Sequence, residues 1–418
     1  MSAKSFCLER WFARVQVFDR KSRFNAKMSV PMFAERTSWN LVPNRLTVAL
    51  ERHRASGSRL IDLACSNPTA CGFACDGEPI LRALANPESL GYEPDPKGLI
   101  TARRAVADYY AAHGVSVDPA SIVLTTATSE AYAFAFRTLC DPCDEVLVPE
   151  PSYPLFEFLA EVQDVRLVRY PLVYDHGWQI DFHALENAIT EKTRAVIVVH
   201  PNNPTGNYAK GYELSRLNEI CAPREMAILA DEVFLDFALD DHVQHPRSFA
   251  ANADALTFTM SGISKISGLP QMKAAWLVAS GPDDLKSQAL ERLEVISDTY
   301  LSVSAPIQHA LPEFLARRNK FQRELLTRVR ANLAELDRQL VAQKLTSRLE
   351  VEGGWYAILR TPATRTDEET AVDLLEAHGV SIHPGHFYDF PGDGYLVVSL
   401  ITPENDFKEG IRLLLGSF

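Results

Sequence analysis

The sequence feature that most constrains the fold is an alternation of short apolar runs with longer amphipathic stretches between about residues 85 and 300. The apolar runs are rich in β-branched residues and predict strands at residues 122–126, 145–148, 166–170, 194–199, 227–230, 256–259 and 274–279. Helical periodicity between them predicts helices at residues 129–139, 154–162 and 212–221. Apolar strands that alternate with helices indicate a mainly parallel sheet buried on both faces. We therefore predict an α/β fold whose large domain has three layers, α/β/α.

The rest of the chain predicts a second, smaller domain. Residues 305 to about 345 are charged and helical in period, and they would connect the two domains. The tail predicts an α+β unit, with strands at 355–360, 380–383 and 396–400 and helices at 368–378 and after Pro403. The predicted parts are an N-terminal extension (1–27), an arm with part of the small domain (28–84), the large domain (85–304) and the small C-terminal domain (305–418).

Charge and cysteine content narrow the class of protein. Lys plus Arg number 42 and Asp plus Glu 54, and the formal net charge of −12 argues against a nucleic-acid surface. No apolar run approaches the roughly 18 residues that a membrane helix needs. The cysteines have neither zinc-site spacing nor the density of a secreted scaffold, so we expect reduced thiols, no metal and a cytoplasmic location. Cys140 and Cys143 have the spacing of a redox motif, but their place in a loop before a strand favours a turn.

Residues 1–27 reverse the charge balance, because basic residues far outnumber Glu9 and Asp19 there. An Arg-rich, acid-poor N-terminus can be an organellar transit peptide, although it lacks the apolar block of a secretory signal. The alternative is an overextended start, with Met28 or Met32 as the natural first residue. We favour the overextended start.

Lys265 is the residue that most strongly indicates function. It stands in Ser261-Gly262-Ile263-Ser264-Lys265, after a predicted strand, and the cationic Lys273 follows eight residues later. An Asn-Asn-Pro-Thr-Gly turn at 202–206 and an apolar strand ending on Asp231 precede it. Ligands of parallel sheets bind at the carboxyl ends of the strands, where these residues lie. A lysine amine, a buried carboxylate and an anion site are what a chain needs to hold an aldehyde cofactor as an imine and protonate its ring.

This ordered set, from about Asp62 to the C-terminus, resembles the class I/II aminotransferases of fold type I, the aspartate aminotransferase-like enzymes that use pyridoxal 5′-phosphate. The resemblance implies that Lys265 holds the cofactor as an internal aldimine and then moves the proton between Cα and C4′. It implies transfer of an amino group from an amino acid or amine to a 2-oxo acid. It also implies a homodimer with shared active sites.

The resemblance assigns further roles around the cofactor. Asp231 would pair with the protonated pyridine nitrogen, and Asn203 would donate to the phenolic oxygen. Tyr153, in Pro151-Ser152-Tyr153-Pro154, would stack on the ring, with ordinary core packing as the alternative. Lys265, Asp231 and Tyr153 are therefore the predicted catalytic residues. Glu232, next to Asp231, is expected to serve structure.

Phosphate needs hydrogen-bond donors and positive charge. Thr128 and Ser129 begin a predicted helix directly after a strand, where free amides and the helix dipole attract an anion. The other predicted phosphate ligands are Ser264, Ser261, Lys273 and, from the partner subunit, Tyr92. The family usually has arginine at the position of Lys273, and lysine lacks its bidentate fork.

Two departures from the family pattern concern the cofactor and the substrate. Phe234 stands where a tyrosine usually donates to the cofactor's phenolate, and Val397 stands where an arginine usually binds the substrate's α-carboxylate. Arg360 is the nearest replacement in sequence, although an exposed strand-end arginine is the simpler interpretation. The loop residues His383, His386 and Tyr388 are further candidates, with loop packing as the alternative. The hypothesis is that this enzyme binds its substrate differently from aspartate and aromatic aminotransferases.

Two rival functions remain open at this point. A pyridoxal-phosphate lyase acting on bonds at Cα or Cβ would use the same scaffold, because the choice of bond depends on geometry that the sequence does not show. A pyridoxal-phosphate-binding regulator of transcription would need an attached DNA-binding module, and the first 80 residues lack a helix-turn-helix pattern.

Overall fold

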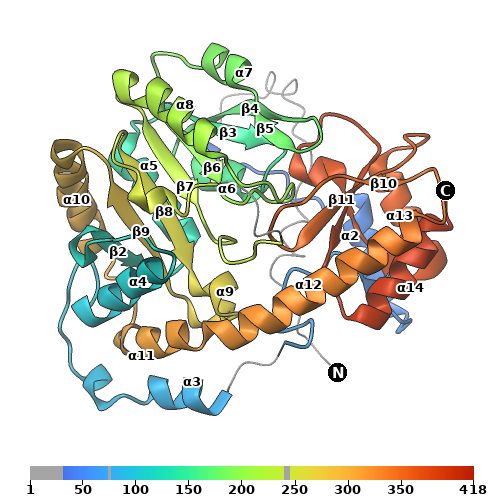
Figure 1. Ribbon diagram of the computed structural model, residues 1–418, viewed down its shortest axis with the longest axis horizontal. Helices are drawn as coiled ribbons and strands as arrows, with labels where there is room; N and C mark the ends of the chain where they lie inside the picture. The colour runs from blue at the N-terminus through green and yellow to red at the C-terminus, as the bar shows by residue number, and fades with distance from the viewer. Residues whose placement is uncertain (1–31, 74–76, 240–244) are drawn as a thin grey trace.

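The computed structural model describes residues 32–73, 77–239 and 245–418. The predictions for residues 1–27 therefore lie outside the described residues. The large sheet has eight strands in the order β2-β9-β8-β7-β6-β3-β4-β5 (Figure 1). Its strands are β2 Ile122–Thr125, β3 Glu145–Glu150, β4 Arg166–Tyr174, β5 Trp178–Ile180, β6 Thr193–Val199, β7 Ala227–Asp231, β8 Thr257–Gly262 and β9 Ala275–Ser280.

Every strand predicted between residues 122 and 279 is confirmed in this sheet. The pairs β4-β3, β3-β6, β6-β7 and β7-β8 are parallel, whereas β9 runs antiparallel to both β8 and β2. The strand β5, which was not predicted, pairs antiparallel with β4 at the edge. The sheet is thus mainly parallel, and the strand ends at which β7 and β8 stop lie side by side.

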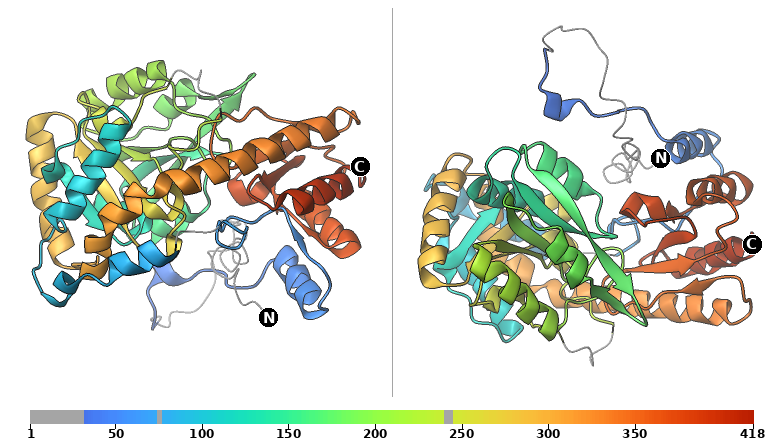
Figure 2. Two further views of the ribbon diagram at one scale, coloured as in Figure 1. Left: turned by 60° about the horizontal axis from the view of Figure 1, so that its bottom comes forward. Right: turned by 90° about the horizontal axis from the view of Figure 1, so that it is seen from above.

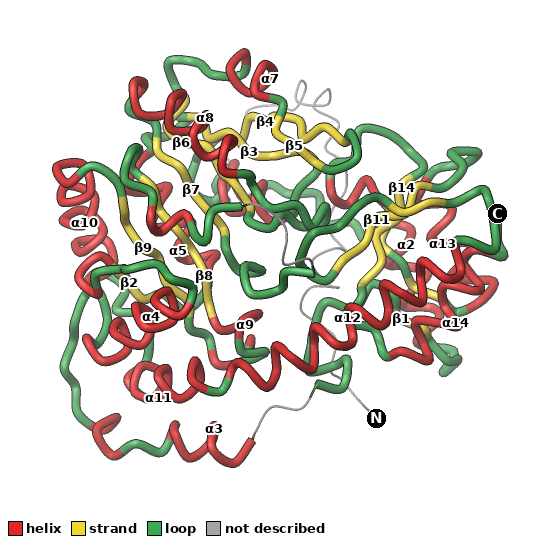
Figure 3. Tube along the Cα trace, in the orientation of Figure 1, coloured by secondary structure: helices red, strands yellow, loops and turns green. Residues whose placement is uncertain are grey.

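Helices cover both faces of this sheet, as predicted (Figures 1 and 3). One face packs against α5 Thr128–Leu139, α6 Leu155–Glu161 and α10 Asp283–Asp298. The other packs against α4 Ile100–Ala112, α7 Phe182–Asn187, α8 Gly211–Cys221 and α11 Ala305–Ala316. Both faces of β7 and β8 and nearly all of β6 are buried, which explains the continuous apolar runs 195–199 and 227–230.

The C-terminal part forms a second sheet, ordered β10-β11-β14-β13 and antiparallel throughout. Its strands are β10 Ser347–Arg348, β11 Tyr356–Arg360, β13 His383–Pro384 and β14 Tyr395–Ser399. The helices α13 Asp367–His378 and α14 Glu404–Leu415 accompany it. The α13 helix begins at a capping box of Thr366 and Glu369 and ends before Gly379, whose φ of 67° suits glycine.

The segment predicted as one long connecting helix is divided. The helix α11 ends at Ala316, and α12 Arg318–Leu340 then runs from the large sheet to the C-terminal sheet (Figure 1). Pro312 lies within α11, where proline removes one helical hydrogen bond. The prediction of a helix to about residue 345 is thus too long by several residues.

The N-terminal region contributes to the C-terminal layer. The strand β1 Ile61–Asp62 pairs in parallel with β12 Val380–Ser381, and α2 Arg45–Ala55 lies against α13 (Figure 2). The short helix α3 Gly77–Leu84 packs on α11. Among the described residues, none of the helices has the length and apolar content that crossing a membrane requires.

Candidate active site

Lys265 lies on α9 Ile263–Ile266, the short helix that directly follows β8. Its Nζ is 4.9 Å from the centre of the Trp355 ring and 5.7 Å from that of Phe234, within the range of cation–π attraction. Burial lowers the pKa of Lys265 to about 8, and the nearby Asp231 carboxylate opposes that shift. Roughly a tenth of such an amine is neutral at pH 7, so it can act as a nucleophile or a base.

Asp231 is the last residue of β7, the strand next to β8. One carboxylate oxygen accepts a hydrogen bond from the Tyr132 hydroxyl at 3.1 Å, and the other accepts from the Val233 amide at 3.1 Å. Burial raises the pKa of Asp231 to about 6, and these two donors and Lys265 oppose the rise. A buried carboxylate of this kind favours a cationic partner.

Glu232 points away from this edge of the sheet, as expected. Its carboxylate accepts hydrogen bonds from the Ser248 hydroxyl at 2.7 Å and the Phe249 amide at 2.6 Å. Consecutive residues alternate in direction, so Asp231 and Glu232 serve different surroundings. Burial raises the pKa of Glu232 to about 8, which is consistent with a structural carboxyl group.

Asn203 and Tyr153 are brought together by two connected loops. The Nδ2 of Asn202 donates to the Pro151 carbonyl at 3.1 Å and to the Thr205 hydroxyl at 2.7 Å. Asn203 is 8% exposed, and its Oδ1 has no hydrogen-bond partner among the described residues. A buried carbonyl oxygen without a hydrogen-bond donor is costly unless a ligand supplies that donor. Tyr153 is half-buried and packs edge-on against Phe156, so ring stacking and core packing both remain compatible with its place.

The predicted phosphate ligands differ in availability. Thr128 and Ser129 open α5, and both are partly exposed. Ser264 lies on α9 and is partly exposed, whereas Lys273 is exposed. Ser261 is fully buried, and its hydroxyl already donates to the Glu232 carbonyl at 3.2 Å. The structure thus leaves the first four available to an anion and engages Ser261 within the protein.

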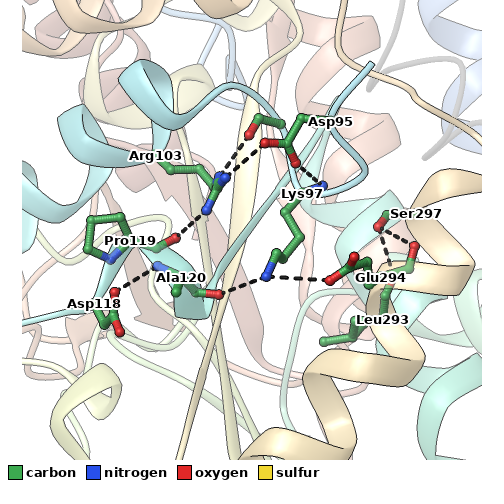
Figure 4. Close-up of polar contacts among 10 residues, drawn as sticks. Asp95, Lys97, Arg103, Asp118, Pro119, Ala120, Leu293, Glu294 and Ser297 are labelled. Atoms are coloured by element: carbon green, nitrogen blue, oxygen red, sulfur yellow. Dashed lines mark hydrogen bonds and ion pairs between the residues drawn. The ribbon is translucent and has the colours of Figure 1, made fainter. Parts of the chain in front are cut away.

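Tyr92 stands apart from the other predicted residues, with 82% of its surface exposed. The segment that follows it is firmly anchored (Figure 4). Arg103 donates to the Gly98 carbonyl at 2.7 Å, the Pro119 carbonyl at 2.9 Å and the Asp95 carboxylate at 2.9 Å. Lys97 donates to the Ala120 carbonyl at 3.4 Å and lies 3.5 Å from the Glu294 carboxylate. The exposed ring of Tyr92 thus stands on a fixed base, where it can contact another molecule.

The substrate-side candidates fall into two groups. Val397 is buried in the middle of β14, opposite Ile358 and His383, and offers no charge. Arg360 is exposed at the far end of β11 from Trp355, roughly 15 Å away by strand rise, so it does not replace the missing arginine. The simpler interpretation of Arg360, as a strand-end surface residue, is therefore the one that the structure supports.

The loop around Pro384 and Gly385 is buried rather than open. The Nδ1 of His383 and the Tyr388 hydroxyl share a hydrogen bond of 2.9 Å, and burial lowers the pKa of His383 to about 3. Burial also lowers the pKa of His386. The Tyr388 carbonyl accepts from the Ser152 amide at 3.0 Å, so this loop touches the one that carries Tyr153.

Two aromatic residues at the site were not predicted from the sequence. Tyr132, on α5, supports Asp231, and Trp355, before β11, covers Lys265. Nothing in their local sequence distinguishes them from core aromatics. Together the residues offer an amine that can condense with a carbonyl, a buried carboxylate for a cation, and a buried side-chain amide, that of Asn203, whose oxygen has no partner among the described residues.

This chain is similar in sequence to known proteins over most of its length. A family model described as aminotransferase class I and II matches residues 76–408. The chain is 29% identical over 380 residues to an alanine aminotransferase of Mycobacterium tuberculosis, covering 88% of this chain and 87% of that protein. It is 26% identical over 375 residues to the glutamate-pyruvate aminotransferase AlaA of Haemophilus influenzae, and the match covers 87% of this chain and 91% of that protein.

Solved structures show the same fold. An Escherichia coli aminotransferase superposes with a TM-score of 0.78 at 25% identity, covering 89% of this chain and 95% of that one. The alanine aminotransferase of Pyrococcus furiosus superposes with a TM-score of 0.81 at 22% identity, and the match again covers 89% of this chain and 95% of that one. The predicted α/β/α architecture with a mainly parallel sheet is therefore confirmed as fold type I.

Proposed function

Because this chain belongs to the class I and II aminotransferases and is a pyridoxal-phosphate-dependent enzyme of that family, we propose that Lys265 is its catalytic lysine and that its amino donor is a small uncharged amino acid. The observation that carries the first part is the proximity of Lys265 and Asp231 at the ends of adjacent parallel strands. The family and its relatives favour amino transfer over the lyase alternative.

The residues fit the cofactor. When bound, pyridoxal phosphate supplies an aldehyde for condensation with amines and a ring that withdraws electrons from the bond being broken. Asp231 would hold the cationic ring nitrogen, and the Nδ2 of Asn203 would donate to the ring's oxygen substituent. Tyr153 would cover one ring face. The start of α5, Ser264 and Lys273 would bind the phosphate.

Lys265 would carry the proton transfer. Its amine has a pKa lowered to about 8 by burial, and the rings of Trp355 and Phe234 restrict where Nζ can lie. A base held near neutrality exchanges protons efficiently in either direction, as reversible amino transfer requires. Phe234 has no hydroxyl, so Asn203 would be the main protein donor to the ring oxygen.

The donor proposal rests on the aromatic surroundings of Lys265 and on the names of the relatives. The rings of Trp355 and Phe234 beside Lys265 offer no positive charge to a carboxylate on the donor's side chain. Relatives named as alanine aminotransferases support an amino donor with a small, uncharged side chain. We propose alanine as the first donor to test, with a 2-oxo acid as acceptor.

This donor proposal is tested by comparing kcat/KM for alanine, aspartate and phenylalanine at fixed 2-oxoglutarate. We expect alanine to exceed both others. Equal, high activity on aspartate and phenylalanine would contradict the proposal, because those donors need a charged or a wide aromatic pocket.

We also propose a homodimer with shared active sites, in the cytoplasm. Tyr92 is exposed on an anchored segment, and the N-terminal arm exposes 91% of Met32 and 74% of Phe33, which suits contact with a second copy. The free cysteines suit a reducing compartment. We further propose that residues 28–84, 85–304 and 305–418 form the arm, large and small domains. The separation of the eight-stranded sheet from the four-stranded sheet supports this division.

Subunit mixing tests the shared site. Tyr92→Ala and Lys265→Ala are each expected to be impaired, but a mixed dimer would combine one intact Lys265 with one intact Tyr92. Random reassociation should restore about a quarter of wild-type activity, because half of the dimers are mixed and each has one complete site. Mixtures that stay as inactive as the parents would refute the sharing.

A further inference from the structure

Two cysteines lie in contact beside the lysine site. The Sγ atoms of Cys65 and Cys71 are 2.8 Å apart, and both residues are free thiols. Cys65 is 9% exposed and Cys71 1% exposed. Both stand on the turn that follows β1, and neither has a part in the proposed amino transfer.

The turn holds the two thiols in place. The Cys71 amide donates to the Asn67 carbonyl at 3.2 Å and to the Pro68 carbonyl at 3.1 Å. The Cys65 thiol donates to the Asn67 carbonyl at 3.7 Å. The residues before the turn are fixed as well, because the Leu63 amide donates to the Ser381 carbonyl at 2.9 Å. The contact between the sulfur atoms is therefore part of a defined structure rather than a chance approach of two flexible side chains.

The two thiols are chemically unequal. Cys71 donates its S–H to the Cys65 sulfur, and this bond together with burial raises the pKa of the Cys71 thiol. Cys65 accepts that hydrogen bond and lies near enough to Lys265 for charge interaction between them. The sulfur that accepts the hydrogen bond is the one placed to attack an oxidant, and the donor thiol next to it is placed to resolve the product.

We propose that Cys65 and Cys71 form a reversible disulfide that acts as a redox modification site at the edge of the active site. Hydrogen peroxide is the oxidant. The Cys65 thiolate attacks one peroxide oxygen, the O–O bond breaks, and a sulfenic acid forms as hydroxide leaves and is protonated to water. The Cys71 sulfur then attacks the Cys65 sulfur, the S–O bond breaks, and a second water leaves. Two thiols are oxidised by two electrons, and one peroxide is reduced to two waters.

The disulfide changes the turn that carries Ser66 and Asn67, and the first cysteine of that turn, Cys65, lies near Lys265. Cys65 loses the S–H that it donates to the Asn67 carbonyl, and the covalent bond ties the two ends of the turn together. We therefore expect oxidation to lower kcat/KM for the amino donor while the cofactor stays bound. A dithiol reductant should restore the original value.

Mass spectrometry of the holoenzyme tests the proposal directly. Residues 60–82 form one tryptic peptide that contains Cys65, Cys71 and Cys75. After peroxide treatment, re-isolation of folded protein by size exclusion and alkylation of free thiols, we expect this peptide to lose two hydrogens. Fragment ions should place the bond between Cys65 and Cys71, and dithiothreitol should reverse it. An unbridged peptide, a bridge to Cys75, or sulfinic acid at Cys65 with Cys71 still alkylated would each overturn the proposal.

Matched variants separate this chemistry from general oxidation. Cys71→Ser should stop the reaction at a Cys65 sulfenic acid, which dimedone would label, and should abolish the reversible loss of kcat/KM. Cys221→Ser removes another buried thiol and should leave bridging unchanged. Because the bridge is measured without substrate, its failure would be distinguishable from failure of the proposed donor specificity. An equal, reversible activity loss in Cys71→Ser would contradict the assigned role.

Discussion

Gly206 offers a quantitative test of how the turn bearing Asn203 is held. Its φ is 73°, and a Cβ built on it would lie 2.4 Å from a Val351 methyl group and 2.6 Å from the Gly353 carbonyl oxygen. The Gly206 carbonyl also accepts hydrogen bonds from the Gly353 amide at 2.8 Å and the Glu352 amide at 3.2 Å. The turn is therefore packed directly on the segment that leads into β11.

Gly206→Ala should lower the free energy of unfolding by two separable effects. The left-handed backbone costs a residue with a Cβ about 1–2 kcal/mol. Forcing the methyl group into the filled space costs about 1–3 kcal/mol more. Gly57 is the matched control, since its φ is 72° and nothing lies within 4 Å of its built Cβ. Gly57→Ala should therefore show only the backbone cost.

The assay is urea denaturation of the apoproteins followed by tryptophan fluorescence, with a cofactor titration of each folded variant. We expect Gly206→Ala to be less stable than Gly57→Ala and to bind pyridoxal phosphate more weakly, because Asn203 is displaced. If the two variants had equal midpoints and slopes, the packing argument would be refuted.

Four further predictions follow from individual site residues. Burial lowers the pKa of Lys265 to about 8, and only the neutral amine attacks an aldehyde. The rate of cofactor association with the apoprotein should therefore rise about tenfold per pH unit below pH 8 and level off above it. An association rate that does not change between pH 6 and 9 would count against this prediction. Asp231→Asn should reduce kcat by about 10²-fold or more through loss of a preorganised charge, and near-normal steady-state turnover would be inconsistent with that role. Phe234→Tyr should lower the pH midpoint of the cofactor's visible band, measured by spectral titration, because a new hydroxyl can donate to the ring oxygen; an unchanged midpoint would place the ring elsewhere. Arg360→Ala should leave kcat/KM for the donor unchanged, and a large loss would bring that exposed residue back into the site.

Much of the fold could be predicted because the large sheet is buried on both faces. Its central strands are then largely apolar, and that pattern is visible in the sequence. The edge strand Trp178–Ile180 was missed because it is short and only its alternate residues are buried. The break between α11 and α12 was missed because Arg317 and Arg318 fit helical periodicity, and only tertiary packing shows where the axis changes.

The candidate site also contains residues that local sequence could predict and residues that it could not. Lys265, Asp231 and Asn203 stand at strand ends or in a distinctive turn, so local sequence could predict their place. Tyr132 and Trp355 reach the site from separate parts of the chain, and each looks like an ordinary core aromatic in its own segment. The contact between Cys65 and Cys71 likewise depends on the shape of one turn, which spacing alone does not determine.

The central claim, that Lys265 supports amino transfer to a bound cofactor, is tested most directly by a visible spectrum of the reconstituted enzyme as alanine is added without an acceptor. We predict that the pyridoxal band converts to the pyridoxamine form and that one pyruvate is released for each cofactor converted, with no conversion in Lys265→Ala. Persistence of the band with every amino donor tried, or conversion that survives in Lys265→Ala, would contradict the account.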